Sequence, residues 1–298
     1  MASDAFRYRV EYALFRGAEA ALGVAGWQGR VVAGQALGGL WHRMDRRRRN
    51  LARAHVARAF PDWPAARVDA LVRAHFAHLG VTAAEFLGLS RCSREELLAC
   101  WRFEGEEHLR AARAAGQGAL LLMAHLGNWE LACAALAARG DPLAAVARRL
   151  KNPWVDARVT RLRERFGLRV LAHRGAARPV LGALRRGEVV AFLLDQRALS
   201  REGVESRFFG RPVSTNRGLA TLALRTGAPV VPAFAERTGA AHVLRFGPPL
   251  EPPGPGPLDE RIAAYTRTYD AAIEAAVRRR PEQWFWLHRR WRLPGEPR

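Results

Sequence analysis

The sequence predicts a mixed α/β fold in which helices flank a largely parallel sheet, preceded by a helical N-terminal region. Two observations support this prediction. From Trp101 onwards, short apolar runs alternate with helical patterns, as is typical of strand–helix units in a parallel sheet. Before residue 100, apolar residues recur at helical spacing. We therefore expect a helical region over residues 1–100 and an α/β core over residues 101–298.

The composition is that of a globular protein with an unusual charge. Hydrophobic residues make up 49% and charged residues 26% of the 298 residues, which excludes a disordered or collagen-like chain. The 48 Lys and Arg residues outnumber the 28 Asp and Glu residues, so the net charge is +20. A chain this basic is attracted to anionic lipid, nucleic acid or acidic proteins. The three cysteines lack metal-binding spacing, which favours a reducing compartment.

The first 50 residues predict amphipathic helices. Residues 12–41 form the most apolar stretch near the start, but Arg16, Glu19 and Arg30 interrupt it. A spanning helix needs roughly 18 consecutive apolar residues, so we expect helices in the headgroup layer of a membrane instead. The basic run 46–49 would contact lipid phosphates. The alternative is a core-facing helical hairpin with a solvated basic turn. No secretory signal is recognised.

Further helices are expected before residue 100. Apolar residues recur at helical spacing over 51–60 and 68–87, and a proline-containing turn separates the two stretches. Ser93 and Glu96 match a capping box that opens a short helix. His75 and His78 lie three residues apart on one helix, but no third metal ligand accompanies them, so we expect ordinary core or surface histidines.

Strand and helix patterns then alternate to the C-terminus. The expected strands cover residues 119–124, 143–147, 168–171, 189–194 and 230–234, with an edge strand at 242–246. The expected helices cover residues 129–139, 153–166, 176–186, 214–226 and 258–280. Asn152 is the expected N-cap of the second of these helices, because proline follows it at the first helical position. The proline-rich segment 247–257 is expected to be a surface connection.

The segment 120–130 is the most informative, because a histidine lies between a buried strand and a helix. His125 follows the strand, at the sheet edge where open α/β folds bind ligands. Glu130, in the first turn of the helix, could accept the second N–H of the imidazole and leave the other nitrogen to act as a base. Gly127 allows a tight turn. The alternative is a loop histidine that caps the helix, with Glu130 complementing the helix dipole.

The segment from His125 to Glu130, His-Leu-Gly-Asn-Trp-Glu, resembles the lipid A biosynthesis acyltransferase family of lauroyl and myristoyl transferases, within the lysophospholipid acyltransferase superfamily. Further segments resemble the family in the same order: Arg148 with residues 150–153 and Asp156, residues 194–196, residues 203–210 with Thr215, residues 227–232, and residues 281–291. The resemblance covers about residues 6–292. Ala147 and Arg149 depart from the family pattern, at positions next to Arg148.

The resemblance implies the transfer of a fatty acyl chain from a thioester to a lipid hydroxyl. His125 would be the general base, and Glu130 would orient it. The implied substrate-binding residues are Asn128, Arg148, Lys151, Asp195, Gln196, Gly210 and Thr215. No covalent acyl-enzyme is implied, and no cofactor or metal is expected. Trp284, Trp286 and Trp291 at the chain end fit interfacial anchoring or core packing better than base stacking.

The implied partners are acyl carrier protein or coenzyme A as acyl carrier, a lipid A precursor as acceptor, and an anionic membrane surface at the cytoplasmic face of the bacterial inner membrane. Other acceptors stay open: a phosphatidylinositol mannoside, an ornithine-type lipid or a lysophospholipid. The alternative outside enzymes is a basic nucleic-acid-binding α/β protein, although no recognised nucleic-acid module accompanies the arginine runs. An inactive, membrane-scaffolding relative is a third possibility, against which the intact His125 and Glu130 argue.

Overall fold

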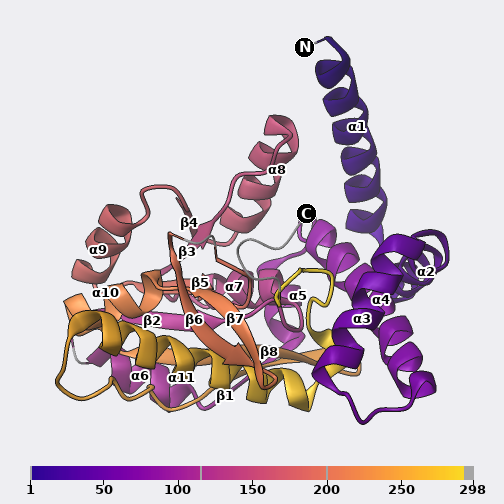
Figure 1. The fold of residues 1–298 in the computed structure, drawn as a ribbon. Helices are drawn as coiled ribbons and strands as arrows, with labels where there is room; N and C mark the ends of the chain where they lie inside the picture. Colours follow the sequence, from indigo (N-terminus) through magenta and orange to yellow (C-terminus); the bar gives the residue numbers. More distant parts are fainter. Residues whose placement is uncertain (1, 115, 199–200, 292–298) are drawn as a thin grey trace.

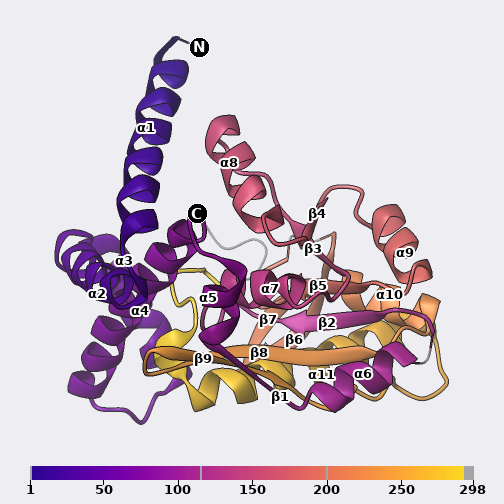
Figure 2. The ribbon, with the colours of Figure 1, turned by 180° about the vertical axis from the view of Figure 1, so that it is seen from behind.

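A seven-stranded sheet with helices on both faces forms the centre of the molecule, and a group of helices stands at one end (Figures 1 and 2). This computed structural model describes residues 2–114, 116–198 and 201–291. The last residues of the expected second region, 292–298, lie outside the described part. The mixed α/β fold with a largely parallel sheet is confirmed.

The N-terminal part is helical, as predicted. It comprises α1 (Ala2–Val24), α2 (Trp27–Met44), α3 (Arg46–Ala59), α4 (Ala65–Gly88) and α5 (Arg94–Ala99). Asp45 caps α3 by accepting a hydrogen bond from the backbone N–H of Arg48. The capping box of Ser93 and Glu96 is present at the start of α5. Side chains of α3 and α4 pack into the same apolar core as one face of the sheet.

The remaining elements alternate. They are β1 (Trp101–Glu104), α6 (Glu106–Ala114), β2 (Ala119–Met123), α7 (Trp129–Ala138), β3 (Leu143–Ala147), α8 (Pro153–Glu164), β4 (Arg169–Ala172), α9 (Ala177–Arg185), β5 (Val189–Leu193), β6 (Gly203–Phe208), β7 (Arg211–Asn216), α10 (Gly218–Thr226), β8 (Val230–Thr238), β9 (Ala241–Phe246) and α11 (Leu258–Arg279). A single 3₁₀ turn, η1 (Pro281–Gln283), follows α11.

The strand order in the large sheet is β1-β9-β8-β2-β5-β3-β4, and only the β8–β9 pair is antiparallel. β2 is buried on both faces, since Leu120 and Leu122 enter one apolar cluster whereas Leu121 and Met123 enter the other. Its run of apolar residues is what a central parallel strand requires. The carboxyl ends of β2 and its neighbour β5 therefore meet at the same edge of the sheet.

Two expected elements differ from the structure. Residues 242–246 form a strand, but β9 is internal rather than an edge, because β1 pairs with its outer side. Residues 214–216 were expected in a helix and instead end β7, which forms a hairpin with β6; α10 begins only at Gly218. The alternating, partly charged sequence of this hairpin hides it from an apolar-run search, because one strand face stays exposed.

Glycines set the packing of α2 on α4. A Cβ atom on Gly38 would clash with the carbonyl oxygen of Phe76, and one on Gly80 with that of Gly34. Because α2 buries this glycine face, its large apolar side chains Leu37 and Leu40 are left exposed. Among the helices of the described residues, none has the length and hydropathy needed to span a bilayer.

Candidate active site

His125 lies two residues beyond the end of β2 and is held by Asp195, which lies two residues beyond the end of β5. Asp195 Oδ1 is 2.8 Å from Nδ1 of His125, and Oδ2 accepts the backbone N–H of the same residue at 3.0 Å. The two strands pair in parallel, and the backbone N–H of Leu194 donates to the carbonyl of Met123. This register brings together two residues that are 70 positions apart in the chain.

The carboxylate of Asp195 fixes the tautomer of the imidazole. Burial raises the pKa of Asp195, but the charge of His125 and hydrogen bonds from His125 and Trp284 outweigh this effect and lower the pKa to about 2. An ionised carboxylate only accepts hydrogen bonds, so Nδ1 carries the proton and Nε2 keeps its lone pair. The side-chain amide nitrogen of Gln196 lies 3.3 Å from Nε2. The arrangement is that of a histidine prepared to take a proton at Nε2.

The predicted contact between Glu130 and the imidazole is wrong. Glu130 forms a two-pronged ion pair with Arg163 of α8, in which Nε of Arg163 lies 2.9 Å from Oε2. Glu130 lies in the first turn of α7 and its side chain is directed toward Arg163 of α8, whereas Nδ1 of His125 faces Asp195, beyond the end of β5. The assignment of Glu130 as a catalytic residue stays a prediction.

A large cavity of about 1450 Å³ adjoins His125. Among the predicted site residues, its lining includes His125, Glu130, Arg148 and Gln196. Seven arginines line it against three carboxylates, so the cavity is positively charged. Apolar side chains from β3, β5 and α9 form other parts of the wall, among them Val146, Phe192 and Leu184. The cavity thus has walls suited to a hydrocarbon chain and to an anionic group.

The other predicted residues do not line this cavity. Asn128 and Thr215 are fully buried, which contradicts a direct contact with substrate. Asn128 caps α7 by accepting the backbone N–H of Leu131, as its side-chain oxygen is suited to do. Gly210 forms the turn of the β6–β7 hairpin with a positive φ of 71°, and Lys151 is exposed in the loop before α8.

Residues 285–290 near the C-terminus form hydrogen bonds with the backbone of two site residues, His125 and Gln196. Arg290 is completely buried, forms an ion pair with Asp270, and donates hydrogen bonds to the carbonyl of Gln196 and to Thr215 Oγ1. The backbone N–H of Phe285 donates to the carbonyl of His125 at 3.0 Å. None of these contacts can be predicted from the local sequence pattern, although residues 281–291 resemble a segment of the acyltransferase family.

The tryptophans near the chain end pack in the core. Trp284 is 1% exposed, Trp286 0% and Trp291 4%, and the indole of Trp284 donates to Asp195. Of the two expectations for these residues, core packing is confirmed. The interfacial alternative is wrong, because buried rings cannot reach a membrane surface.

Comparison with known proteins gives one family. The family model described as bacterial lipid A biosynthesis acyltransferase matches residues 4–293. A phosphatidylinositol mannoside acyltransferase of Mycobacterium tuberculosis (strain ATCC 25618 / H37Rv) is 34% identical over 63% of this chain, and the match spans 58% of that relative. The corresponding enzyme of Mycolicibacterium smegmatis is 31% identical over 82% of this chain and 78% of the relative. A lipid A biosynthesis lauroyltransferase of Escherichia coli K12 is 29% identical over 88% and 85%.

Proposed function

This chain belongs to the bacterial lipid A biosynthesis acyltransferase family, and on that premise we propose that it moves a fatty acyl chain from an acyl thioester to a hydroxyl group of a glycolipid. The observation that carries the proposal is His125, oriented by the buried Asp195 beside a cavity large enough for a lipid substrate. Acyl carrier protein or coenzyme A would carry the thioester. The proposed reaction uses no resident cofactor or metal.

The proposed chemistry is direct transfer with His125 as general base. Nε2 takes the proton of the acceptor hydroxyl as its oxygen attacks the thioester carbonyl carbon, and a tetrahedral oxyanion forms. When this intermediate collapses, the carbon–sulfur bond breaks, and the thiolate takes the proton from the imidazolium to leave as a thiol. Asp195 stabilises the imidazolium. General base catalysis contributes about 10²–10⁴-fold, and preorganised donors to the oxyanion contribute further.

The charge of the cavity supports an anionic acceptor. Arg148, Arg197 and Arg225 are among the seven arginines of its lining, and guanidinium groups bind phosphate through paired hydrogen bonds. A lipid A precursor is the first proposed acceptor. A phosphatidylinositol mannoside is the second proposed acceptor. The two mycobacterial phosphatidylinositol mannoside acyltransferases share 34% and 31% of their aligned residues with this chain, whereas the lauroyltransferase shares 29%.

Thioester turnover by purified protein tests the reaction and the base together. Wild type and His125→Ala are offered acyl carrier protein and coenzyme A thioesters, with each of the two acceptors in turn. We expect ester product from wild type and none from His125→Ala, with unchanged circular dichroism. Equal turnover by both proteins would remove the base assignment. If neither acceptor yields ester with wild type, both proposed acceptors are wrong.

We further propose that the protein binds the cytoplasmic face of the inner membrane peripherally, through α1, α2 and the start of α8. Of the eleven large apolar side chains that are exposed in the described residues, four lie on α1 and four on α2, Leu150 lies just before α8, Trp154 lies in its first turn, and Leu258 lies elsewhere, at the start of α11. α1 and α8 project from the same side of the molecule (Figure 1), and Nδ2 of Asn152, the N-cap of α8, donates to the carbonyl of Tyr8. Clustered apolar exposure of this kind marks an interaction surface.

Vesicle sedimentation separates the apolar part of this proposal from the electrostatic part. Arg46 and Arg47 are exposed at the start of α3, and each is expected to contribute about 1 kcal/mol on an anionic surface. Changing both to Gln should weaken binding to anionic vesicles and leave binding to neutral vesicles unchanged. The double variant Leu37→Ser/Leu40→Ser should weaken both. Unchanged binding of both variants to both vesicle types contradicts the membrane proposal.

A further inference from the structure

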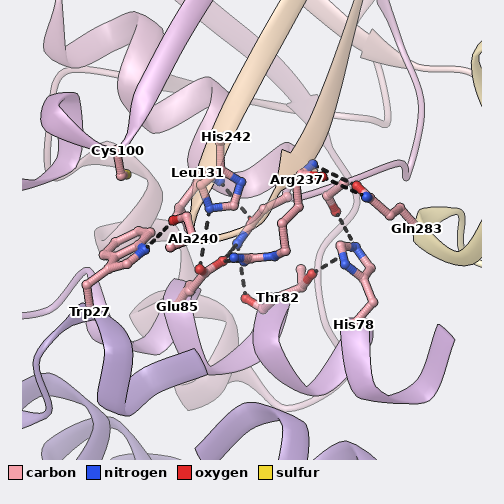
Figure 3. A network of polar contacts seen from close by, with 12 residues as sticks. Trp27, His78, Thr82, Glu85, Cys100, Leu131, Arg237, Ala240, His242 and Gln283 are labelled. Atoms are coloured by element: carbon pink, nitrogen blue, oxygen red, sulfur yellow. Dashed lines mark hydrogen bonds and ion pairs between the residues drawn. The ribbon is translucent and has the colours of Figure 1, made fainter. Parts of the chain in front are cut away.

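A buried polar cluster (Figure 3) lies outside the cavity and contacts Gly127 and Asn128, which follow His125 in the chain. Its centre is Glu85 of α4, which is completely buried. Glu85 forms an ion pair with Arg237 of β8, and its Oε1 lies 3.3 Å from Nε2 of His242 on β9. It also accepts a hydrogen bond from Nδ2 of Asn128 at 2.8 Å. The carboxylate of Glu85 thus links helix α4 to strands β8 and β9 and to the residue that caps α7.

Glu85 is ionised in this setting. Burial raises its pKa, but the hydrogen bond and charge of His242 and the charge of Arg237 outweigh burial and lower the pKa. A buried ion pair of this kind is weak evidence for stability, because desolvation offsets much of the attraction and apolar replacements are often neutral or stabilising. Because the cluster contacts the residues that follow His125, it has a possible role in orienting that histidine.

The cluster is connected to His125 through the two residues that precede α7. Asn128 uses its amide nitrogen on Glu85 and its oxygen to cap α7, so Glu85 sets the orientation of the cap. Nε2 of His78, also on α4, lies 3.2 Å from the carbonyl of Gly127. Burial and the charge of Arg237 lower the pKa of His78 to about 4, so the ring is neutral and donates to that carbonyl.

The turn at Gly127 is held from the other side as well. Its backbone N–H donates to the carbonyl of Gln283 at 3.1 Å, and Gln283 pairs with the backbone of Arg237 in both directions. Gly127 has a φ of 59°, and a Cβ atom there would clash with the carbonyl of Ala235. Gly127 and Asn128 are therefore both held by hydrogen bonds, and the side chains that bind them, His78 and Glu85, come from α4.

We propose that Glu85 is a positioning residue of the transfer reaction. Its carboxylate holds Asn128 and thereby fixes the backbone of residues 125–128, which aims Nε2 of His125 at the acceptor hydroxyl. The inference rests on the proposed function of His125. A displacement of about 1 Å in a reacting group costs about 10²-fold in rate, so a loosened loop is measurable in kcat.

An exchange of the two side chains tests this proposal. Asn128→Asp keeps the N-cap oxygen but replaces the donor with a second carboxylate oxygen facing Glu85. We expect kcat to fall by about 10²-fold with little change in KM for the thioester. In the double variant Glu85→Gln/Asn128→Asp, the amide of the new glutamine donates to the carboxylate of the new aspartate. The hydrogen bond is restored in the opposite direction, and the pair keeps the single negative charge of the wild type. We expect the double variant to recover at least about tenfold in kcat.

The matched control is Asp141→Asn, beyond the opposite end of α7. Asp141 pairs with Arg113 and Arg139 and lies outside the cavity that adjoins His125. Its loss should lower stability without changing kcat per folded molecule. If Asn128→Asp behaves like this control, or if the double variant regains stability but not kcat, Glu85 has only a structural role and the proposal is overturned.

Hydrogen exchange gives a readout that does not depend on activity. Asn128→Asp should speed exchange at the backbone amides of Gly127 and Leu131, and the double variant should slow it again. Unchanged exchange in the single variant overturns the positioning claim even if no acceptor has been found. Conversely, faster exchange together with equal turnover by wild type and His125→Ala would remove the base assignment of His125, and with it the positioning role of Glu85, and would leave only the contact between Glu85 and the loop.

Discussion

Replacement of Asp195 by asparagine removes the charge that faces the imidazole and keeps the size of the side chain. The carboxylate accepts hydrogen bonds from Nδ1 and the backbone N–H of His125 and from the indole of Trp284. An asparagine amide can donate to the ring instead, which stabilises the opposite tautomer. Nε2 then carries the proton and cannot take one from the acceptor hydroxyl.

The magnitude follows from the geometry of the pair. Nδ1 and Oδ1 are 2.8 Å apart, and the His125 side chain is 20% exposed. The charge centres of imidazolium and carboxylate then lie about 4 Å apart, which at an effective dielectric constant of about 20 corresponds to about 4 kcal/mol. This attraction acts on the imidazolium formed during proton transfer. We therefore expect Asp195→Asn to lower kcat by about 10³-fold.

The assay is the single-turnover rate of ester formation, because it reports the chemical step rather than product release. Glu130→Gln is the comparison, since it breaks the ion pair with Arg163 and leaves the contact between Asp195 and His125 intact. We expect a smaller loss in that variant. A rate for Asp195→Asn within about fivefold of wild type, or a larger loss in Glu130→Gln, would refute this reasoning and favour the role that the motif first suggested for Glu130.

Two further predictions concern stability. Asp195 has a pKa of about 2 in the folded protein against a reference of 3.8, so its contribution is full above about pH 4 and is lost as the pH falls toward 2. In urea unfolding, the difference in free energy between wild type and Asp195→Asn should shrink by about 2 kcal/mol over this range; a constant difference contradicts it. Gly38→Ala should lower the free energy of unfolding by about 1–3 kcal/mol, because the new Cβ atom meets Phe76. Gly39→Ala, whose Cβ atom would meet nothing within 4 Å, should raise it by up to about 1 kcal/mol, and equal effects of the two substitutions would contradict the glycine packing.

Most of the secondary structure could be predicted because its causes are local. The apolar run of residues 119–123, the cap at Asn152 and the capping box at Ser93 each depend on neighbours a few positions away. The elements that were predicted incorrectly depend on strand pairing, which a search for apolar runs does not detect. β6 and β7 are strands because they pair with each other in a hairpin, and β9 is internal because β1, more than 130 positions earlier in the chain, pairs with its outer side.

The candidate site divides in the same way. His125 and its position at the end of a central strand could be predicted from the segment around it. Its carboxylate partner could not, because spacing favoured Glu130, whereas parallel pairing of β2 with β5 brings Asp195 beside it. The buried Asn128 was assigned to substrate for a related reason. A polar residue next to a catalytic histidine is equally compatible with both roles until its burial is known.

The sequence alone therefore determined the α/β alternation, the helical N-terminal part, the histidine and the family resemblance, since each is written in residues close together in the chain. Only the tertiary structure decided which carboxylate orients His125, which helix holds the loop that follows it, and which apolar side chains of α2 stay exposed. Those outcomes depend on strand order and on the close approach of Gly38 to α4. Both are set by contacts between residues tens of positions apart, and a local sequence pattern contains no information about such contacts.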